Sequence, residues 1–128
     1  MATLHYPSHL WYQQSDEWLL VEGDQGTIGV SDYAQDALND IVFVELPEVG
    51  DVLKKGAVFG TVESVKAAAD LKMPIDGEVV AVNTELEATP ETINAQPYTG
   101  GWIIKIKVTG AVEALMNADA YRAFCESR

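Results

Sequence analysis

A six-residue motif occurs twice in this chain, at residues 47–52 and at residues 74–79. Both copies have the order Pro-x-x-Gly-acid-Val. Proline and glycine favour turns, and each copy lies between runs of residues that suit β-strands. Two matched turns of this kind predict a chain of two related halves, each built from antiparallel strands.

A lysine, Lys66, lies between the two copies of the motif, in the sequence Glu-Ser-Val-Lys-Ala at residues 63–67. The residues before it, 57–63, are rich in strand formers, and the residues after it lead through a turn at 75–77 into another strand at 78–82. This order predicts a β-hairpin with Lys66 at its tip. A lysine in a turn is most often a solvated charge, so position alone leaves both a solvated and a modified lysine open.

The apolar pattern places further strands in the chain. We expect them at residues 17–21, 27–30, 41–46 and 102–108. The last of these alternates, so Ile104, Ile106 and Val108 are expected to face the core while two lysines face solvent. The predicted fold class is therefore mainly β.

Helices are expected only at the periphery of this β-structure. Ser31 and Asp32 offer an N-cap for a short helix over residues 33–39. Residues 83–101 are typical of a loop, with one helical turn expected at residues 91–94. Neither segment is long enough to form a layer of its own.

The C-terminal part of the chain has the composition of a helix. We predict helix over residues 112–124, in one or two pieces, with Asp119 as the N-cap of a second piece. A length of 128 residues suits one domain with its own core. The expected organisation is a single domain over residues 1–128, with an N-terminal arm at 1–16 and a C-terminal helical segment at 111–128.

The formal net charge of −12 limits the partners of this chain. An acidic surface repels phosphates, and the clusters of basic residues that bind nucleic acid or anionic lipid are missing from the sequence. The chain also has no run of about 18 apolar residues, the length a membrane span needs. We therefore expect neither nucleic acid nor a membrane as a partner.

The cysteine content indicates a compartment. Cys125 is the single cysteine, and a lone thiol fits a reducing environment better than a secretory one. The first residues lack the features of a signal peptide or a transit peptide. We expect a cytoplasmic bacterial protein, or a protein of the mitochondrial matrix if a transit peptide has been removed, and we expect it to be a monomer.

The sequence offers little catalytic machinery. It contains no nucleophile elbow, phosphate loop or paired-cysteine metal site. His5 and His9 are four residues apart, but a proline lies between them and a helix that would bring them together is not expected there. We therefore predict no metal and no catalytic residues. The remaining hypothesis is a carrier whose chemistry belongs to a group attached to the chain.

Residues 63–67 resemble the lipoylation site of the glycine cleavage system H-protein family. The similarity continues in the same order through most of the chain, roughly from residue 14 to residue 126. The other similar positions are residues 29–38, 42–47, 77–79, Asn94, 97–98 and 101–106.

The resemblance implies a fold and a cofactor. The implied fold is a barrel-sandwich hybrid of the lipoyl/biotinyl-like type, with two antiparallel lobes, short peripheral helices and a C-terminal helix. The implied cofactor is lipoic acid, joined as an amide to Lys66. The residues around the lysine that a lipoyl-attaching enzyme would recognise are Glu63, Ser64, Val65 and Ala67.

The resemblance also implies a function in glycine catabolism and one-carbon metabolism. The lipoyl arm would take an aminomethyl group from glycine decarboxylase (P-protein) and deliver it to an aminomethyltransferase (T-protein). It would then pass reducing equivalents to dihydrolipoamide dehydrogenase (L-protein). On this reading the chain is a non-catalytic carrier protein and those enzymes, with a lipoyl-attaching enzyme, are its partners.

An aminomethyl thioether is an N,S-acetal that water converts to formaldehyde and ammonia, so a carrier has to exclude water from its cargo. In the family the loaded arm folds into a surface cleft, and the positions that match its polar groups here are Ser15, Glu17 and Asp70. The family usually has His-Glu-Trp at this point, whereas this chain has Asp16-Glu17-Trp18. The departure puts in doubt any role assigned to an imidazole.

Other functions remain open at this level. One is an H-protein-like relay that donates lipoyl groups to other enzymes, and another is an unlipoylated interaction protein with the same fold. A lipoyl domain of an acyltransferase predicts Asp-Lys-Ala at the tip, and a biotin carrier predicts Met-Lys-Met. Neither of these tripeptides occurs around Lys66.

Overall fold

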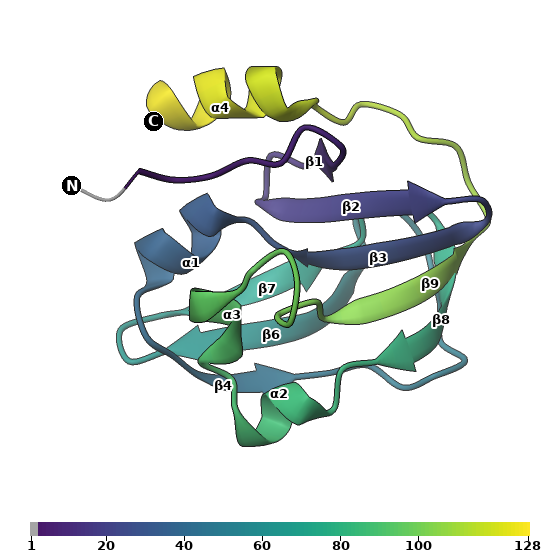
Figure 1. Ribbon diagram of the computed structural model, residues 1–128. Coiled ribbons are helices and arrows are strands. Elements are labelled where there is room, and N and C mark those ends of the chain that lie inside the picture. The colour runs from purple at the N-terminus through teal and green to yellow at the C-terminus, as the bar shows by residue number, and fades with distance from the viewer. Residues whose placement is uncertain (1–2) are drawn as a thin grey trace.

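The computed structural model describes residues 3–128 and contains two antiparallel β-sheets with short helices around them (Figure 1). The larger sheet has six strands in the order β1-β2-β3-β9-β8-β5, and the smaller has three in the order β4-β6-β7. Two sheets of this kind confirm the expected mainly β fold with two antiparallel lobes. The strands are β1 (Trp11–Tyr12), β2 (Glu17–Glu22), β3 (Gln25–Val30), β4 (Ile41–Glu45), β5 (Val52–Leu53), β6 (Val58–Ser64), β7 (Ala68–Lys72), β8 (Gly77–Val82) and β9 (Ile104–Val108).

The main core lies where apolar side chains of the two sheets meet. Ile104 and Ile106 of β9 are fully buried, and Lys107 between Ile106 and Val108 is exposed, as the alternation predicts. Val62 of β6 and Leu71 of β7 join the same cluster from the smaller sheet. The β6–β7 hairpin is therefore anchored in the core along its length while its tip projects away from it.

The two copies of the repeated motif pair directly with each other, because β5 and β8 are neighbours in the larger sheet. The Gly50 amide donates to the Val79 carbonyl at 2.8 Å, and the Val79 amide donates to the Asp51 carbonyl at 2.8 Å. The glycines of the two copies serve different purposes. Gly50 has a φ of 100°, which favours glycine, whereas a Cβ on Gly77 would come within 2.7 Å of the Ile106 side chain.

Three short helices lie at the edges of the sheets. Helix α1 (Asp32–Leu38) begins after Ser31, whose Oγ accepts from the Ala34 amide at 3.2 Å, so the predicted cap is confirmed for Ser31. Helix α3 (Thr92–Ala95) confirms the helical turn expected at residues 91–94 within one residue. Helix α2 (Glu85–Ala88) was not predicted, and it buries Leu86 against the core.

The C-terminal helix α4 (Ala118–Glu126) is shorter than predicted. Asn117 caps it by accepting from the Ala120 amide at 2.9 Å, so the assignment of Asp119 as an N-cap was wrong. Residues 112–117 are not helical, because the Met116 backbone exchanges two hydrogen bonds of 2.8 Å with that of Tyr12. The backbone pairing with β1 prevails over the helical propensity of this segment.

Aromatic residues attach α4 to the N-terminal part of the chain, and Figure 1 shows α4 beside β1 and the chain leading to it. The rings of Tyr12 and Tyr121 stack with centroids 4.6 Å apart, and Tyr6 meets Tyr121 edge-on at 5.2 Å. Cys125 is buried in the same cluster with a free thiol. Within residues 3–128, no helix has the length and apolar character that crossing a membrane requires.

Candidate functional site

The β6–β7 hairpin places Lys66 at its tip, which confirms the prediction from the sequence. The Ser64 amide donates to the Ala67 carbonyl at 2.7 Å, so only Val65 and Lys66 lie beyond the closing hydrogen bond. The Ser64 hydroxyl oxygen accepts from the amides of Lys66 at 3.2 Å and Ala67 at 3.1 Å. A serine at this position thus satisfies backbone donors that a two-residue tip leaves without strand partners.

The tip is also attached to the rest of the molecule. The Val65 amide donates to the Asp40 carbonyl at 3.2 Å, in the chain that joins α1 to β4 beside the tip (Figure 1). Val65 has 70% of its surface exposed, and Glu63, Lys66 and Ala67 are exposed as well. The Lys66 amine is therefore open to a partner while the backbone that carries it is fixed.

A cavity of about 170 Å³ lies between α1, the turn before β2 and the β6–β7 hairpin, and we call it the Ser15 cavity. Its polar residues are Ser15, Asp16 and Asp70, which come from two segments far apart in the sequence. Its remaining lining is mostly apolar, from β3, α1 and the hairpin: Val30, Ala34, Ala37, Leu38, Val62, Ala69 and Leu71. The structure therefore brings Ser15 and Asp70 together, as the resemblance implies.

Glu17 lies behind the lining of the Ser15 cavity and is only 1% exposed. Its Oε1 accepts from the Ser15 hydroxyl at 2.5 Å and from Gln13 Nε2 at 2.8 Å, and its Oε2 accepts from the Lys72 amide at 3.0 Å. Burial raises the pKa of the Glu17 carboxyl, and these hydrogen bonds lower it by less, so the pKa lies above its ordinary value. Glu17 contacts the cavity through Ser15.

Several residues of this arrangement were not found from the sequence. Gln13 and the backbone amide of Lys72 hold Glu17, and a backbone donor has no signal in a sequence. Asp16 was noted only as a departure from the family pattern, yet it lines the Ser15 cavity. Arg128 holds Asp16 with an ion pair of 2.8 Å across 112 positions of the chain. No local pattern predicts a contact of that separation.

The chemistry of the Ser15 cavity suits a particular kind of ligand. Its walls are mostly apolar, and its polar groups are one hydroxyl and two carboxylates. A chain that is apolar along its length and ends in a cation fits such a surface, since a carboxylate and a cation form a charge-assisted hydrogen bond. No group of three or more metal-binding side chains is arranged for a metal ion within residues 3–128.

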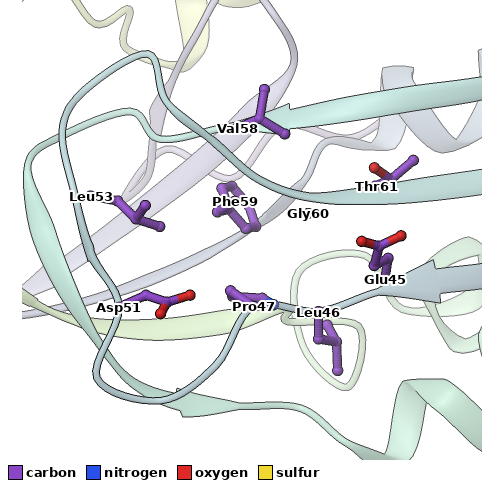
Figure 2. Close-up of a pocket in the computed structure, with 9 residues that line it drawn as sticks. All are labelled: Glu45, Leu46, Pro47, Asp51, Leu53, Val58, Phe59, Gly60 and Thr61. Carbon is purple, nitrogen blue, oxygen red and sulfur yellow. The ribbon is translucent and has the colours of Figure 1, made fainter.

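A second cavity, of about 200 Å³, borders the opposite end of β6, and we call it the Phe59 cavity. Figure 2 shows Phe59 near Leu53 and Pro47, with the carboxylates of Asp51 and Glu45 on opposite sides of this group in the view. The sequence singled out none of these residues as a site. The Phe59 cavity has no lysine in its lining and lies away from the tip of the hairpin.

Comparison with known proteins gives consistent matches over nearly the whole chain. A family model described as Glycine cleavage H-protein matches residues 10–128. A glycine cleavage system H protein of Chromohalobacter salexigens is 54% identical over 122 residues, which cover 93% of this chain and 93% of that protein. A mitochondrial glycine cleavage system H protein 2 of Arabidopsis thaliana is 49% identical and covers 91% of this chain and 76% of its own length.

A solved structure supports the same relationship. The crystal structure of a glycine cleavage system H protein from Mycobacterium marinum superposes with a TM-score of 0.87 at 36% sequence identity. The match covers 92% of this chain and 97% of that one. The superposition therefore extends over most of the fold.

Proposed function

Because this chain belongs to the glycine cleavage H-protein family, the carrier component of the glycine cleavage system, we propose that it carries an aminomethyl group on a lipoyl arm attached to Lys66. The observation that supports this most is the geometry of the tip. Lys66 is exposed on a two-residue turn whose backbone is fixed by Ser64 and by Asp40. An exposed amine on a fixed backbone is what an attaching enzyme requires.

The residues present fit a lipoyl group. The amine of Lys66 forms the amide, and the Ser15 cavity beside the hairpin has the apolar walls and the polar side that an aminomethylated arm needs. When bound, the lipoyl group supplies the sulfur that takes the aminomethyl group from glycine decarboxylase to aminomethyltransferase, and its dithiol is reoxidised by dihydrolipoamide dehydrogenase. The chain itself catalyses none of these steps.

The role of the chain's own residues is to bind the cargo and exclude water. The Ser15 hydroxyl donates its proton to Glu17, so the lone pairs of its oxygen are available to accept from the ammonium end of the cargo. Asp70 supplies a negative charge in the lining of the same cavity. Glu17 orients Ser15, and the apolar wall keeps water from the N,S-acetal.

Intact-mass measurement tests the proposal most directly. Protein from its native source, grown with lipoate, should show a lipoyl adduct that Lys66→Arg abolishes, because arginine offers no amine for the amide. Lys72→Arg, at the far end of β7 in the same hairpin, is the matched control and should keep the adduct. Protein that is wholly unmodified under these conditions would contradict the carrier function.

A second measurement separates the carrier from a lipoate relay. Lipoylated protein should support glycine-dependent exchange of bicarbonate with glycine decarboxylase, because the arm accepts the aminomethyl group only in a carrier. Absence of exchange in a lipoylated sample would point to the relay. The bacterial relatives support the cytoplasm as the compartment that we propose, and the free Cys125 thiol is compatible with it.

A further inference from the structure

We propose that Asp16 is a positioning residue, held by Tyr121 and Arg128 of the C-terminal segment, that keeps Ser15 and its bond to Glu17 in place at the Ser15 cavity. The inference rests on the proposed carrier function, and it adds α4 to the parts of the molecule that determine how long the loaded arm survives. Asp16 stands where the family that this chain resembles usually has histidine.

The backbone of Asp16 shapes the turn that presents Ser15. Its amide donates to the Gln13 carbonyl at 2.9 Å, and the Gln13 amide donates to the Glu17 carbonyl at 2.9 Å. Asp16 itself has a φ of 81°. This is the three-residue hairpin loop in which a left-handed residue follows a tight turn, a position that glycine usually occupies and that Asp and Asn tolerate best among other residues.

The side chain of Asp16 is bound from α4 and the residues after it. Its Oδ1 accepts from Arg128 Nη1 at 2.8 Å and from the Tyr121 hydroxyl at 2.8 Å. Arg128 Nη2 donates to the Gln14 carbonyl at 3.0 Å, so one guanidinium holds two residues of the same turn. The Asp16 and Arg128 side chains are 20% and 24% exposed, and this shielding makes the pair stronger than an open surface ion pair.

The contacts of Asp16 also reach the apolar wall of the cavity. The Ser31 amide donates to the Asp16 carbonyl at 2.9 Å, and the Ser31 hydroxyl bonds to the hydroxyl of Tyr121 at 2.6 Å. Ser31 is the N-cap of α1, which supplies Ala34 to the lining. Asp16 therefore joins three elements around one cavity: the turn, α1 and α4.

The charges around the cavity support this assignment. Burial lowers the pKa of Arg128, but its hydrogen bond with Asp16 and the charge of that carboxylate outweigh burial, so the Arg128 pKa lies above its ordinary value. Asp16 and Asp70 both line the cavity, and Arg128 neutralises Asp16. Asp70 is therefore the carboxylate that is available to the cargo, and Asp16 positions Ser15.

The test uses lipoylated protein loaded with the aminomethyl group, and it measures the rate of formaldehyde release. Asp16→Asn and Arg128→Gln should each accelerate release about tenfold, which corresponds to about 1.4 kcal/mol. The double variant should accelerate release by less than the product of the two single effects, because both substitutions remove the contact between Asp16 and Arg128. Asp16→Gly, which relieves the backbone strain but removes the carboxylate, should behave like Asp16→Asn.

Asp119→Asn is the matched control, since it breaks the exposed ion pair of 3.6 Å with Arg122 on the same helix. It should leave the release rate unchanged. A wild-type release rate in Asp16→Asn and Arg128→Gln, or strictly additive effects, would overturn the proposal. Wild-type protein that cannot be lipoylated or loaded would instead contradict the carrier function.

A measurement on the unlipoylated chain tests the positioning role independently. Arg128→Gln should shift the backbone amide resonances of Ser15 and Glu17, whereas Asp119→Asn should leave them in place. A thermal unfolding curve for each variant identifies any that lose stability as a whole. Unchanged Ser15 and Glu17 resonances in Arg128→Gln would overturn the inference. This outcome does not depend on whether Lys66 can be lipoylated.

Discussion

The Ser15 cavity and the Phe59 cavity border the same strand, β6, and have similar volumes of about 170 and 200 Å³. They differ in what holds their polar groups. Ser15 is bonded to the buried Glu17, which is fixed in turn by β7 through the Lys72 amide. In the Phe59 cavity, the Asp51 carboxylate accepts only a local bond of 3.2 Å from the Glu48 amide.

This difference shows that volume alone does not identify a binding site. Polar groups that are fixed by bonds from distant elements keep their geometry when a ligand arrives, and such preorganisation is what a cargo site needs. The Phe59 cavity is formed by residues of β4, β5 and β6 and of the segment between β4 and β5, and we interpret it as a gap left by the packing of these elements.

The largest effect is expected at Gly60, beside the Phe59 cavity. A Cβ there would lie 2.4 Å from the Glu45 carbonyl, so Gly60→Ala should push β4 away from β6. Overpacking of this kind lowers the free energy of unfolding by about 3 kcal/mol. Denaturant unfolding measures that loss, and the release rate of formaldehyde from the loaded arm should stay within about twofold. A tenfold faster release would show that the two cavities are coupled.

The next effect concerns Asp70 in the Ser15 cavity. Asp70→Asn removes the proposed charge opposite the ammonium end, so formaldehyde release from the loaded arm should be about tenfold faster, equivalent to about 1.4 kcal/mol. Asp51→Asn in the Phe59 cavity is the matched control and should leave the rate unchanged. Equal rates in both variants would remove the distinction between the cavities.

The smallest effect is a pH dependence of stability at Glu17. Its pKa is raised above the ordinary 4.5 in the folded state, so the folded state holds the proton more tightly than the unfolded state. The free energy of unfolding contributed by Glu17 must therefore fall as pH rises from about 4.5 through the raised pKa, by about 1.4 kcal/mol for each unit of difference.

Comparison of the wild type with Glu17→Gln measures this contribution, because glutamine does not titrate. The stability of the wild type relative to the variant should decrease as pH rises through that range. An advantage of the wild type that grows with pH would mean that the three donors around Glu17 outweigh its burial.

The parts of the fold that the sequence predicts are those with local causes. The hairpin tip follows from strand formers on both sides of Lys66, and the start of α1 follows from a serine that bonds an amide three residues away. The resemblance added Ser15 and Asp70, which do line one cavity. Their roles toward a cargo remain predictions.

The parts that the sequence did not predict depend on distant partners. Met116 has a high helical propensity, but its backbone pairs with Tyr12, and Ala114 adopts a φ of 56° that ends any helix there. An isolated glutamate in a sequence is expected to be solvated. Glu17 is buried and hydrogen-bonded here because the fold brings three donors to its carboxylate. The ion pair between Asp16 and Arg128 spans 112 positions and leaves no periodic trace.

The hydrogen bond between the Val65 amide and the Asp40 carbonyl has a consequence for the kinetics of transfer. It holds the backbone that carries Lys66, so the motion of the proposed lipoyl arm would come from the rotatable bonds of the Lys66 side chain and its attached group. A short tether on a fixed backbone gives its end an effective concentration in the millimolar range at any site within reach. Return of such an arm to the Ser15 cavity would then be a first-order event, independent of protein concentration. A partner enzyme of the proposed carrier would have to compete with that return through its own concentration and association rate.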